Sequence, residues 1–261
     1  MPEEQQGPVV HQARRGPVIL ITIDRPKARN ALNLRVLTDI AAALAAAEAD
    51  PDIRAAVLTG GAEVFSAGAD VDMLSGQTAA TYAASPNAAA FAAIRDTGLP
   101  VVAAVSGYCL GGGCEIALGC DLVVASDTAV LGQPEIALGI IPGAGGTQLW
   151  GRRAGRGPQA LAALTGASVD AFAARRMGLV DRVVPAAALV ETAVEIAAGI
   201  AARAPLAVRA AKTAMRAGAD MPLTAALDHE IALLAPLLAS EDAAEGIAAF
   251  QDKRPATFKG R

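Results

Sequence analysis

Two glutamates in apolar company, Glu115 and Glu135, have the residue type and surroundings for acid and base chemistry. Glu115 follows Cys114 and precedes Ile116, whereas Glu135 stands in the stretch Gly132-Gln133-Pro134-Glu135-Ile136. Apolar surroundings shift carboxyl pKa values, which suits one such group to accept a proton and another to donate one. Taken alone, Glu115 is also explained as an acid that balances the dipole at a helix start. The second carboxyl therefore makes the functional interpretation stronger.

A run of three glycines, Gly111-Gly112-Gly113, precedes Glu115. Glycines at a helix start allow another group close to the backbone, and the unpaired N–H groups there favour developing negative charge. An anion or oxyanion site is predicted, and close packing of helix on strand is the alternative. A nucleotide-phosphate site is disfavoured because no Lys-Ser or Lys-Thr follows, and Ile116 occupies the place of a dinucleotide motif's third glycine.

A third segment with exposed-backbone character is Phe65-Ser66-Ala67-Gly68-Ala69-Asp70. Its small residues follow a predicted buried strand and would leave the main chain accessible to a ligand. Alone the segment reads as an ordinary loop at a strand end.

The elements that must position these segments alternate between strand and helix, which predicts an α/β core. Expected strands cover Val18 to Ile23, Ala55 to Thr59, Val101 to Val105, Leu122 to Ala125 and Ala129 to Leu131. Expected helices cover Leu34 to Ala49, with Asn33 as N-cap, and the glycine turn to about Leu118.

Beyond about Val184 only helices are predicted, over Ala186 to Ala202, Leu206 to Arg216, Leu223 to Leu238 and Glu241 to Phe250. Consecutive amphipathic helices with little of their own to pack on usually cover another surface or a neighbouring subunit. We expect residues 1–200 to form a core with the active site and residues 201–261 to form a helical oligomerisation domain.

Composition excludes several classes of protein. The 261 residues carry a net charge of −4 with no basic cluster, which disfavours nucleic acid as a partner. Apolar runs are too short to cross a bilayer, and the acidic N-terminal residues 1–6 do not suit a targeting segment, so a cytoplasmic location is expected. Cys109, Cys114 and Cys120 lack metal-site spacing, and with only two histidines neither a zinc site nor a disulfide framework is predicted.

The chain resembles the enoyl-CoA hydratase, or crotonase, family through several motifs that occur in order along nearly its whole length. Besides the three segments above, they are Arg25-Pro26-Lys27-Ala28-Arg29-Asn30-Ala31-Leu32, Ile141-Pro142-Gly143-Ala144-Gly145-Gly146-Thr147, Ala174-Arg175-Arg176-Met177-Gly178-Leu179-Val180 and Phe250-Gln251-Asp252-Lys253-Arg254. The resemblance implies a crotonase-like α/β fold, a spiral of ββα units with a C-terminal helical trimerisation domain, assembled as a homotrimer or as a hexamer of two trimers.

The resemblance also implies roles for single residues. The backbone N–H groups of Ala69 and Gly112 match the family's oxyanion hole, and fixed donors of that kind can lower the barrier to an enolate-like state by about 3 kcal/mol each. Glu115 would orient and deprotonate a water for attack on C3, and Glu135 would supply the proton to C2. The backbone of Gly143 would help to position the water. No cofactor or metal is implied, because coenzyme A is part of the substrate.

Coenzyme A would lie along two segments that the resemblance indicates. Its expected contacts are Lys27, Ala28, Ala67, Ala69, Asp70, Val71 and Asp72, with Phe250 and Lys253 contributed by a neighbouring subunit. Many hydratases carry lysine where this chain has Asp72, and an acid there cannot attract the coenzyme's phosphates. Asp70 is expected to order its loop.

Two rival functions stay open from the sequence. An isomerase of the same family shifts a double bond and can work with a single base, so the pair of glutamates favours hydration. A noncatalytic, RNA-binding relative is disfavoured by the acidic balance and by both glutamates. Acyl length and branching are not predicted, although the segment from Met73 to Ala93, with Tyr82 and Phe91, is expected to form the pocket wall.

Overall fold

The core of the protein is a six-stranded sheet, in a computed structural model that describes residues 7–261. The strand order is β1-β2-β3-β4-β6-β9, and only β1 runs antiparallel to its neighbour. The strands are β1 (Val10–Arg15), β2 (Val18–Ile23), β3 (Ala55–Thr59), β4 (Val101–Val105), β6 (Leu122–Ser126) and β9 (Arg182–Val184). The expected strands at β2, β3 and β4 are confirmed at both ends, because continuous apolar runs are what a parallel sheet covered on both faces requires.

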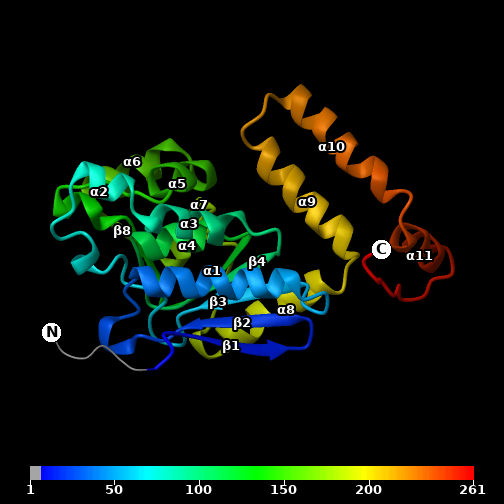
Figure 1. The fold of residues 1–261 in the computed structure, drawn as a ribbon, viewed down its shortest axis with the longest axis horizontal. Coiled ribbons are helices and arrows are strands. Elements are labelled where there is room, and N and C mark those ends of the chain that lie inside the picture. Colours follow the sequence, from blue (N-terminus) through cyan, green and yellow to red (C-terminus); the bar gives the residue numbers. More distant parts are fainter. Residues whose placement is uncertain (1–6) are drawn as a thin grey trace.

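Helices cover both faces of this sheet (Figure 1). On one face lie α1 (Leu34–Ala49), α3 (Pro86–Asp96) and α4 (Gly112–Gly119), and on the other lies α8 (Leu189–Ala201). The predicted N-cap is confirmed, since the Asn33 side chain accepts a hydrogen bond from Val36 N at the start of α1. Successive strand residues therefore bury their side chains in two separate apolar layers.

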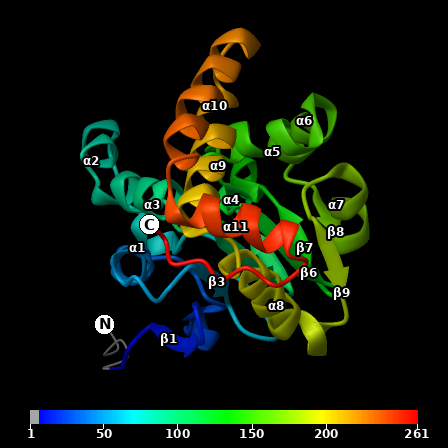
Figure 2. The ribbon, with the colours of Figure 1, turned by 90° about the vertical axis from the view of Figure 1, so that its right-hand side faces the viewer.

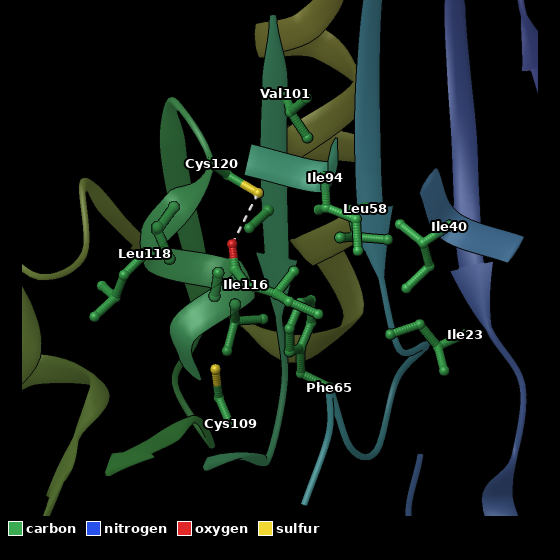
Figure 3. Close-up of a cluster of buried hydrophobic side chains, with 14 of the residues drawn as sticks. Ile23, Ile40, Leu58, Phe65, Ile94, Val101, Cys109, Ile116, Leu118 and Cys120 are labelled. Carbon is green, nitrogen blue, oxygen red and sulfur yellow. Dashed lines mark hydrogen bonds between the residues drawn. The ribbon is translucent and has the colours of Figure 1, made fainter. Parts of the chain in front are cut away.

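The larger apolar layer packs against α4, the helix that follows the glycine turn (Figure 3). Ile116 of α4 packs there with Phe65 and Leu58, and the two side chains Phe65 and Leu58 are fully buried. The three cysteines belong to this part of the chain as buried free thiols, as their apolar surroundings predicted. Cys120 donates to Ile116 O at 3.3 Å. This bond lies at the C-terminal end of α4, whose apolar side chains pack in the larger layer.

A second, three-stranded sheet joins the two glutamate segments. Its strands are β5 (Tyr108–Leu110), β7 (Val130–Gly132) and β8 (Ser168–Asp170). β5 and β7 run parallel with Leu110 opposite Gly132, and Gly111 N donates to Gly132 O at 2.9 Å. Both strands therefore end at the same edge, where one leads into α4 and the other into the turn η3 (Pro134–Leu138). The expected strand at Ala129 to Leu131 is thus displaced by one residue.

Three helices after residue 201 extend away from the sheets (Figure 1). They are α9 (Pro205–Gly218), α10 (Leu223–Leu237) and α11 (Glu241–Gln251), and Figure 2 shows α11 crossing beside the base of the α9–α10 hairpin. Lys212 of α9 anchors the hairpin, because its Nζ donates to Leu99 O at 2.7 Å and to Asp121 Oδ2 at 2.8 Å. By contrast, α10 has no buried residue. It packs against α9 and leaves the rest of its surface exposed.

Some elements differ from the expectation or were not foreseen. The helix expected from Ala186 begins instead with a short turn, η4 (Ala186–Ala188), before α8. The unforeseen elements are β1, β5, β8, β9, α2 (Ala79–Ala83), α3, α5 (Gly146–Ala154), α6 (Arg156–Thr165), α7 (Ala171–Met177), η1 (Pro26–Ala28), η2 (Val71–Met73) and η3. β1 escaped notice because it is an exposed, polar edge strand that lacks an apolar alternation.

The acidic N-terminal segment on which the targeting prediction rested, residues 1–6, lies outside the described residues. Among residues 7–261, no single helix is long and apolar enough to cross a membrane; α10 and α11 reach that length only together, and the chain bends by 83° between them.

Candidate active site

The carboxyl of Glu135 lies over the glycine turn that begins α4. Gly111 has φ +49°, and a Cβ added there would stand 2.8 Å from Glu135 Oε1. A side chain at this position would therefore be strained by the backbone and would collide with the carboxyl. Glycine at position 111 lets the segment that carries Glu115 and the segment that carries Glu135 meet.

Glu115 is a buried carboxyl held by two main-chain donors. Its side chain enters the pocket from the first turn of α4, and the residue is only 5% exposed. Oε1 accepts hydrogen bonds from Ala144 N and from Gly146 N, each at 2.7 Å. Burial raises the pKa of Glu115, while these hydrogen bonds to the charged form act in the opposite direction. The carboxyl therefore has a fixed orientation.

Glu135 is less buried than Glu115 and is more easily protonated than a solvated glutamate. Burial raises its pKa to about 7, its own backbone N–H lowers it, and the negative charge of Glu115 raises it further. Because the charge of Glu115 raises the pKa of Glu135, the two carboxyls are close enough to interact and belong to one site. Near neutral pH, Glu135 exists as both carboxylic acid and carboxylate.

Gln133 is a site residue to which the sequence had assigned no role. Its side chain is completely buried. With the amide nitrogen toward Glu135, the orientation that satisfies both ends of the amide, it donates to both carboxyl oxygens of Glu135 at 3.1 Å. A Cβ on Gly146 would come within 2.6 Å of the same amide, so this glycine leaves room for Gln133. Gln133 thus lies between Glu135 and the loop that holds Glu115.

The main-chain N–H groups of Ala69 and Gly112 are free to bind a ligand. Within residues 7–261, neither group donates to a protein acceptor. Ala69 forms a parallel bridge with Leu32, in which Leu32 N donates to Gly68 O and Asp70 N donates to Leu32 O, both at 2.8 Å. This pairing leaves the Ala69 N–H on the opposite side of the segment. A Cβ added at Gly112 would stand 3.7 Å from Ala69 N, so the two groups are neighbours.

A partly buried ion pair supports the segment that presents Ala69. Arg25 Nη1 donates to Ala31 O at 2.6 Å and to Asp70 Oδ2 at 3.1 Å. Behind it, Asn30 Oδ1 accepts from Arg25 N at 2.8 Å. Asp70 therefore orders its loop, as expected, and Arg25 is a second site residue that sequence reasoning missed.

One pocket brings the predicted chemical residues together. Ala69, Gly112, Glu115, Glu135 and Gly143 all line it. The remaining wall is mostly apolar and consists of Met73, Leu74, Tyr82, Asn87, Ala88, Phe91, Ile140, Ile141 and Ala144. The two carboxyls can donate and accept protons within this pocket. The two unpaired amides can stabilise negative charge that develops on a ligand oxygen beside them.

The residues expected to contact coenzyme A fall into two groups. Lys27 and Ala28 belong to η1, which lies beside the segment that presents Ala69, since Ala67 N donates to Arg29 O at 3.0 Å. In the adjoining turn η2, Val71 and Asp72 are exposed.

Phe250, at 86% exposed, and Lys253 lie in and just after α11, an element that Figure 1 shows far from α2, α3 and α4. Neither residue lines the pocket. The chain does not bring them to its own pocket.

No group of three or more metal-ligating side chains occurs in the part of the chain that the structure describes. Burial raises the pKa of the thiols of Cys109 and Cys120, that of Cys120 to about 12. These thiols are therefore protonated near neutral pH and unsuited to nucleophilic chemistry.

Comparison with known proteins gives consistent matches over almost the whole chain. A family model described as enoyl-CoA hydratase/isomerase matches residues 13–261. The 2,3-dehydroadipyl-CoA hydratase of Escherichia coli is 43% identical over 95% of this chain and 98% of its own length. A probable enoyl-CoA hydratase of Mycobacterium tuberculosis is 41% identical over 93% of this chain and 94% of its own. The crystal structure of an enoyl-CoA hydratase from Bacillus anthracis superposes with a TM-score of 0.92 at 34% identity, covering 97% of this chain and 100% of the other.

Proposed function

The chain belongs to the enoyl-CoA hydratase/isomerase family, and from that premise we propose that it adds water reversibly to trans-2-enoyl-CoA thioesters to give 3-hydroxyacyl-CoA. The fold is of the crotonase-like α/β class that the sequence predicted. One observation carries the proposal: two carboxyls and two unpaired main-chain amides line the same pocket.

The thioester oxygen binds between Ala69 N and Gly112 N. Attack at C3 moves charge through C2 onto this oxygen, and donors that are already in place stabilise that charge without reorganisation. Their fixed position follows from the Leu32 bridge on one side and from the helix start on the other. The dipole of α4 adds a favourable positive potential at Gly112.

The two glutamates divide the proton transfers. Glu115, kept in orientation by Ala144 N and Gly146 N, accepts a proton from the water whose oxygen bonds to C3. Glu135, with a pKa raised to about 7, donates its proton to C2. Both carboxyls face one pocket, so oxygen and proton add to the same face of the double bond. The reverse steps dehydrate a 3-hydroxyacyl thioester.

The residues expected to bind coenzyme A keep that role in the proposal. The coenzyme lies along Lys27, Ala28, Ala67 and the backbone up to Asp72, and no further cofactor takes part in the steps above. The pathway is fatty-acid β-oxidation or a related acyl-CoA catabolism, which fits relatives such as the 2,3-dehydroadipyl-CoA hydratase. We place the enzyme in the cytoplasm.

We also propose that residues 201–261 assemble the protein into a homotrimer, or a hexamer of two trimers, with residues 1–200 as the catalytic core. An apolar stripe along α10 supports this proposal: its exposed residues are Leu223, Leu227, Ile231 and Leu234, followed by Leu238. In the assembly Phe250 and Lys253 reach the coenzyme of a neighbouring subunit.

A single assay tests the proposed reaction. Crotonyl-CoA should lose its enoyl absorbance when the protein is added, and 3-hydroxybutyryl-CoA should appear in equal amount. Isomerase activity, the closest alternative, would instead convert a 3-enoyl-CoA into the conjugated 2-enoyl thioester. Conversion of the 3-enoyl substrate with no hydration of crotonyl-CoA would overturn the hydratase assignment.

A further inference from the structure

We propose that the hydroxyl of Tyr82 binds the water that adds to C3 and holds it beside Glu115. The inference rests on the proposed hydratase function and adds a further residue to its mechanism. Besides the two glutamates, the residues that line the pocket include two with polar side chains, Tyr82 and Asn87. The proton transfers described above use neither of them.

The hydroxyl of Tyr82 lies against the loop that holds Glu115. Tyr82 belongs to the short helix α2, and its hydroxyl oxygen stands 2.5 Å from the position that a Cβ on Gly143 would occupy. The next residue in that loop, Ala144, donates its N–H to Glu115 Oε1 at 2.7 Å. Tyr82 therefore meets this loop one residue before a donor to the proposed base.

Both polar groups at this contact can bind a water. Within residues 7–261, the Tyr82 hydroxyl has no hydrogen-bond partner, and the Gly143 N–H donates to no protein acceptor. A tyrosine hydroxyl can donate one hydrogen bond and accept others, whereas a main-chain N–H can only donate. The two groups therefore offer a water an acceptor and a donor side by side.

A water at this contact has a use for each of its four bonding positions. Glu115 takes one hydrogen, and the hydroxyl oxygen of Tyr82 accepts a hydrogen bond from the other. The Gly143 N–H donates to one lone pair, and the second lone pair attacks C3. After the attack Tyr82 still accepts from the new 3-hydroxyl group, so the tyrosine neither gains nor loses a proton. The water is thereby oriented before the reaction.

Glycine at position 143 has a physical reason in this arrangement. Its φ lies outside the left-handed region, so alanine would fit the main chain there and would keep the N–H. The added Cβ would collide with the hydroxyl of Tyr82, whereas the ring carbon Cζ is 3.7 Å away, an ordinary contact. Alanine at position 143 should therefore become tolerable once the hydroxyl is removed.

The test is a double-mutant cycle on crotonyl-CoA hydration. Tyr82→Phe should lower kcat about tenfold, because one hydrogen bond that orients the water is lost. Gly143→Ala should lower kcat of the wild type by a similar factor, because it pushes the hydroxyl aside. In the Tyr82→Phe background the same change should cost less than about twofold, since no hydroxyl remains to be displaced. Butyryl-CoA has no double bond and takes up no water, so its inhibition constant should be equal for all four proteins.

Tyr108→Phe is the matched control. Tyr108 is the only other tyrosine, is also 46% exposed and is not among the residues that line this pocket, so kcat should stay at the wild-type value.

An unchanged kcat in Tyr82→Phe would overturn the proposal while the proposed function stands. Equal losses from Gly143→Ala with and without the hydroxyl would overturn it too. Weaker inhibition of Tyr82→Phe by butyryl-CoA would instead assign the tyrosine to the shape of the pocket. Absence of crotonyl-CoA hydration by the wild type would remove the proposed function, and this inference with it.

Discussion

The two segments that carry the glutamates differ in what surrounds each carboxyl. Glu115 sits in the first turn of a buried helix, is 5% exposed and accepts two main-chain hydrogen bonds on one oxygen. Glu135 sits in the short turn η3, whose outer residues Ile136 and Leu138 are exposed. One of its hydrogen-bond donors is a side chain, that of Gln133, and not a main-chain group. A substitution at position 133 can therefore remove this donor.

This difference shows how one residue type can serve two purposes. Burial raises the pKa of Glu115 too, but there two fixed amides oppose the shift by favouring the carboxylate, and they orient the side chain. At Glu135, burial and the nearby negative charge favour the acid form, so a proton is retained near pH 7. In the proposed mechanism, the surroundings of the two glutamates, and not their residue type, decide which acts as base and which as acid.

The largest effect is expected when either carboxyl is removed. Glu115→Gln and Glu135→Gln should each slow hydration of crotonyl-CoA by about 10²–10⁴-fold, the usual contribution of a positioned acid or base. The decrease should appear in kcat, because the glutamine keeps the size of the side chain. Glu195→Gln, on the exposed side of α8, is the matched control and should retain full activity. If both glutamate variants kept full activity, neither carboxyl would take part in the reaction and the contrast between them would have no functional meaning.

The pH dependence sharpens the assignment of the acid. Hydration needs Glu135 protonated, and its pKa is about 7. Above this value kcat/KM for crotonyl-CoA should fall about tenfold for each pH unit. In Glu135→Gln the residual rate should lack this alkaline limb. An alkaline limb that persists in Glu135→Gln would assign the titration to another group.

Gln133 offers a smaller change that acts on only one of the two carboxyls. Gln133→Leu keeps the buried volume but removes donors that favour the charged form of Glu135, so the pKa of Glu135 should rise. We expect kcat to fall on the order of tenfold, because Glu135 also loses its orientation. The alkaline limb of the pH profile should move to higher pH. Gln12→Leu, on the exposed strand β1, is the control, and a limb at the wild-type position would contradict the proposed contact.

The smallest effect is on stability. The pKa of Glu135 is near 4.5 when ordinarily solvated and about 7 in the fold, so the free energy of unfolding falls as pH rises from about 4.5 to 7. The variant Glu135→Gln has no carboxyl to ionise at this position, so its free energy of unfolding should not fall in this way. At pH 8 it should be more stable than the wild type by on the order of 1–3 kcal/mol, reduced by partial solvation, with the difference vanishing near pH 4. Urea unfolding at both pH values measures this, and a variant less stable at pH 8 would show that the ionised carboxyl is not strained.

Local patterns in the sequence were enough for the central strands, α1 and the glycine turn before Glu115. The pairing of β5 with β7 was not predictable, because strands of three residues carry almost no alternation signal. That pairing is what brings Glu115 and Glu135 to one edge. The roles of Arg25 and Gln133 were not predicted either. The partner of Arg25, Asp70, is distant in sequence, and the partner of Gln133, Glu135, lies in the unforeseen turn η3. A polar residue inside an apolar stretch, as Gln133 is, was the available signal.

The most direct test of the facing carboxyls is a double-mutant cycle on crotonyl-CoA hydration. If Glu115 and Glu135 act in one transition state, then Glu115→Gln/Glu135→Gln should lose little more activity than the more damaging single variant, as groups that work as a unit do. Losses that multiply, with each substitution acting in full regardless of the other, would show that the two glutamates serve separate steps and would contradict the account.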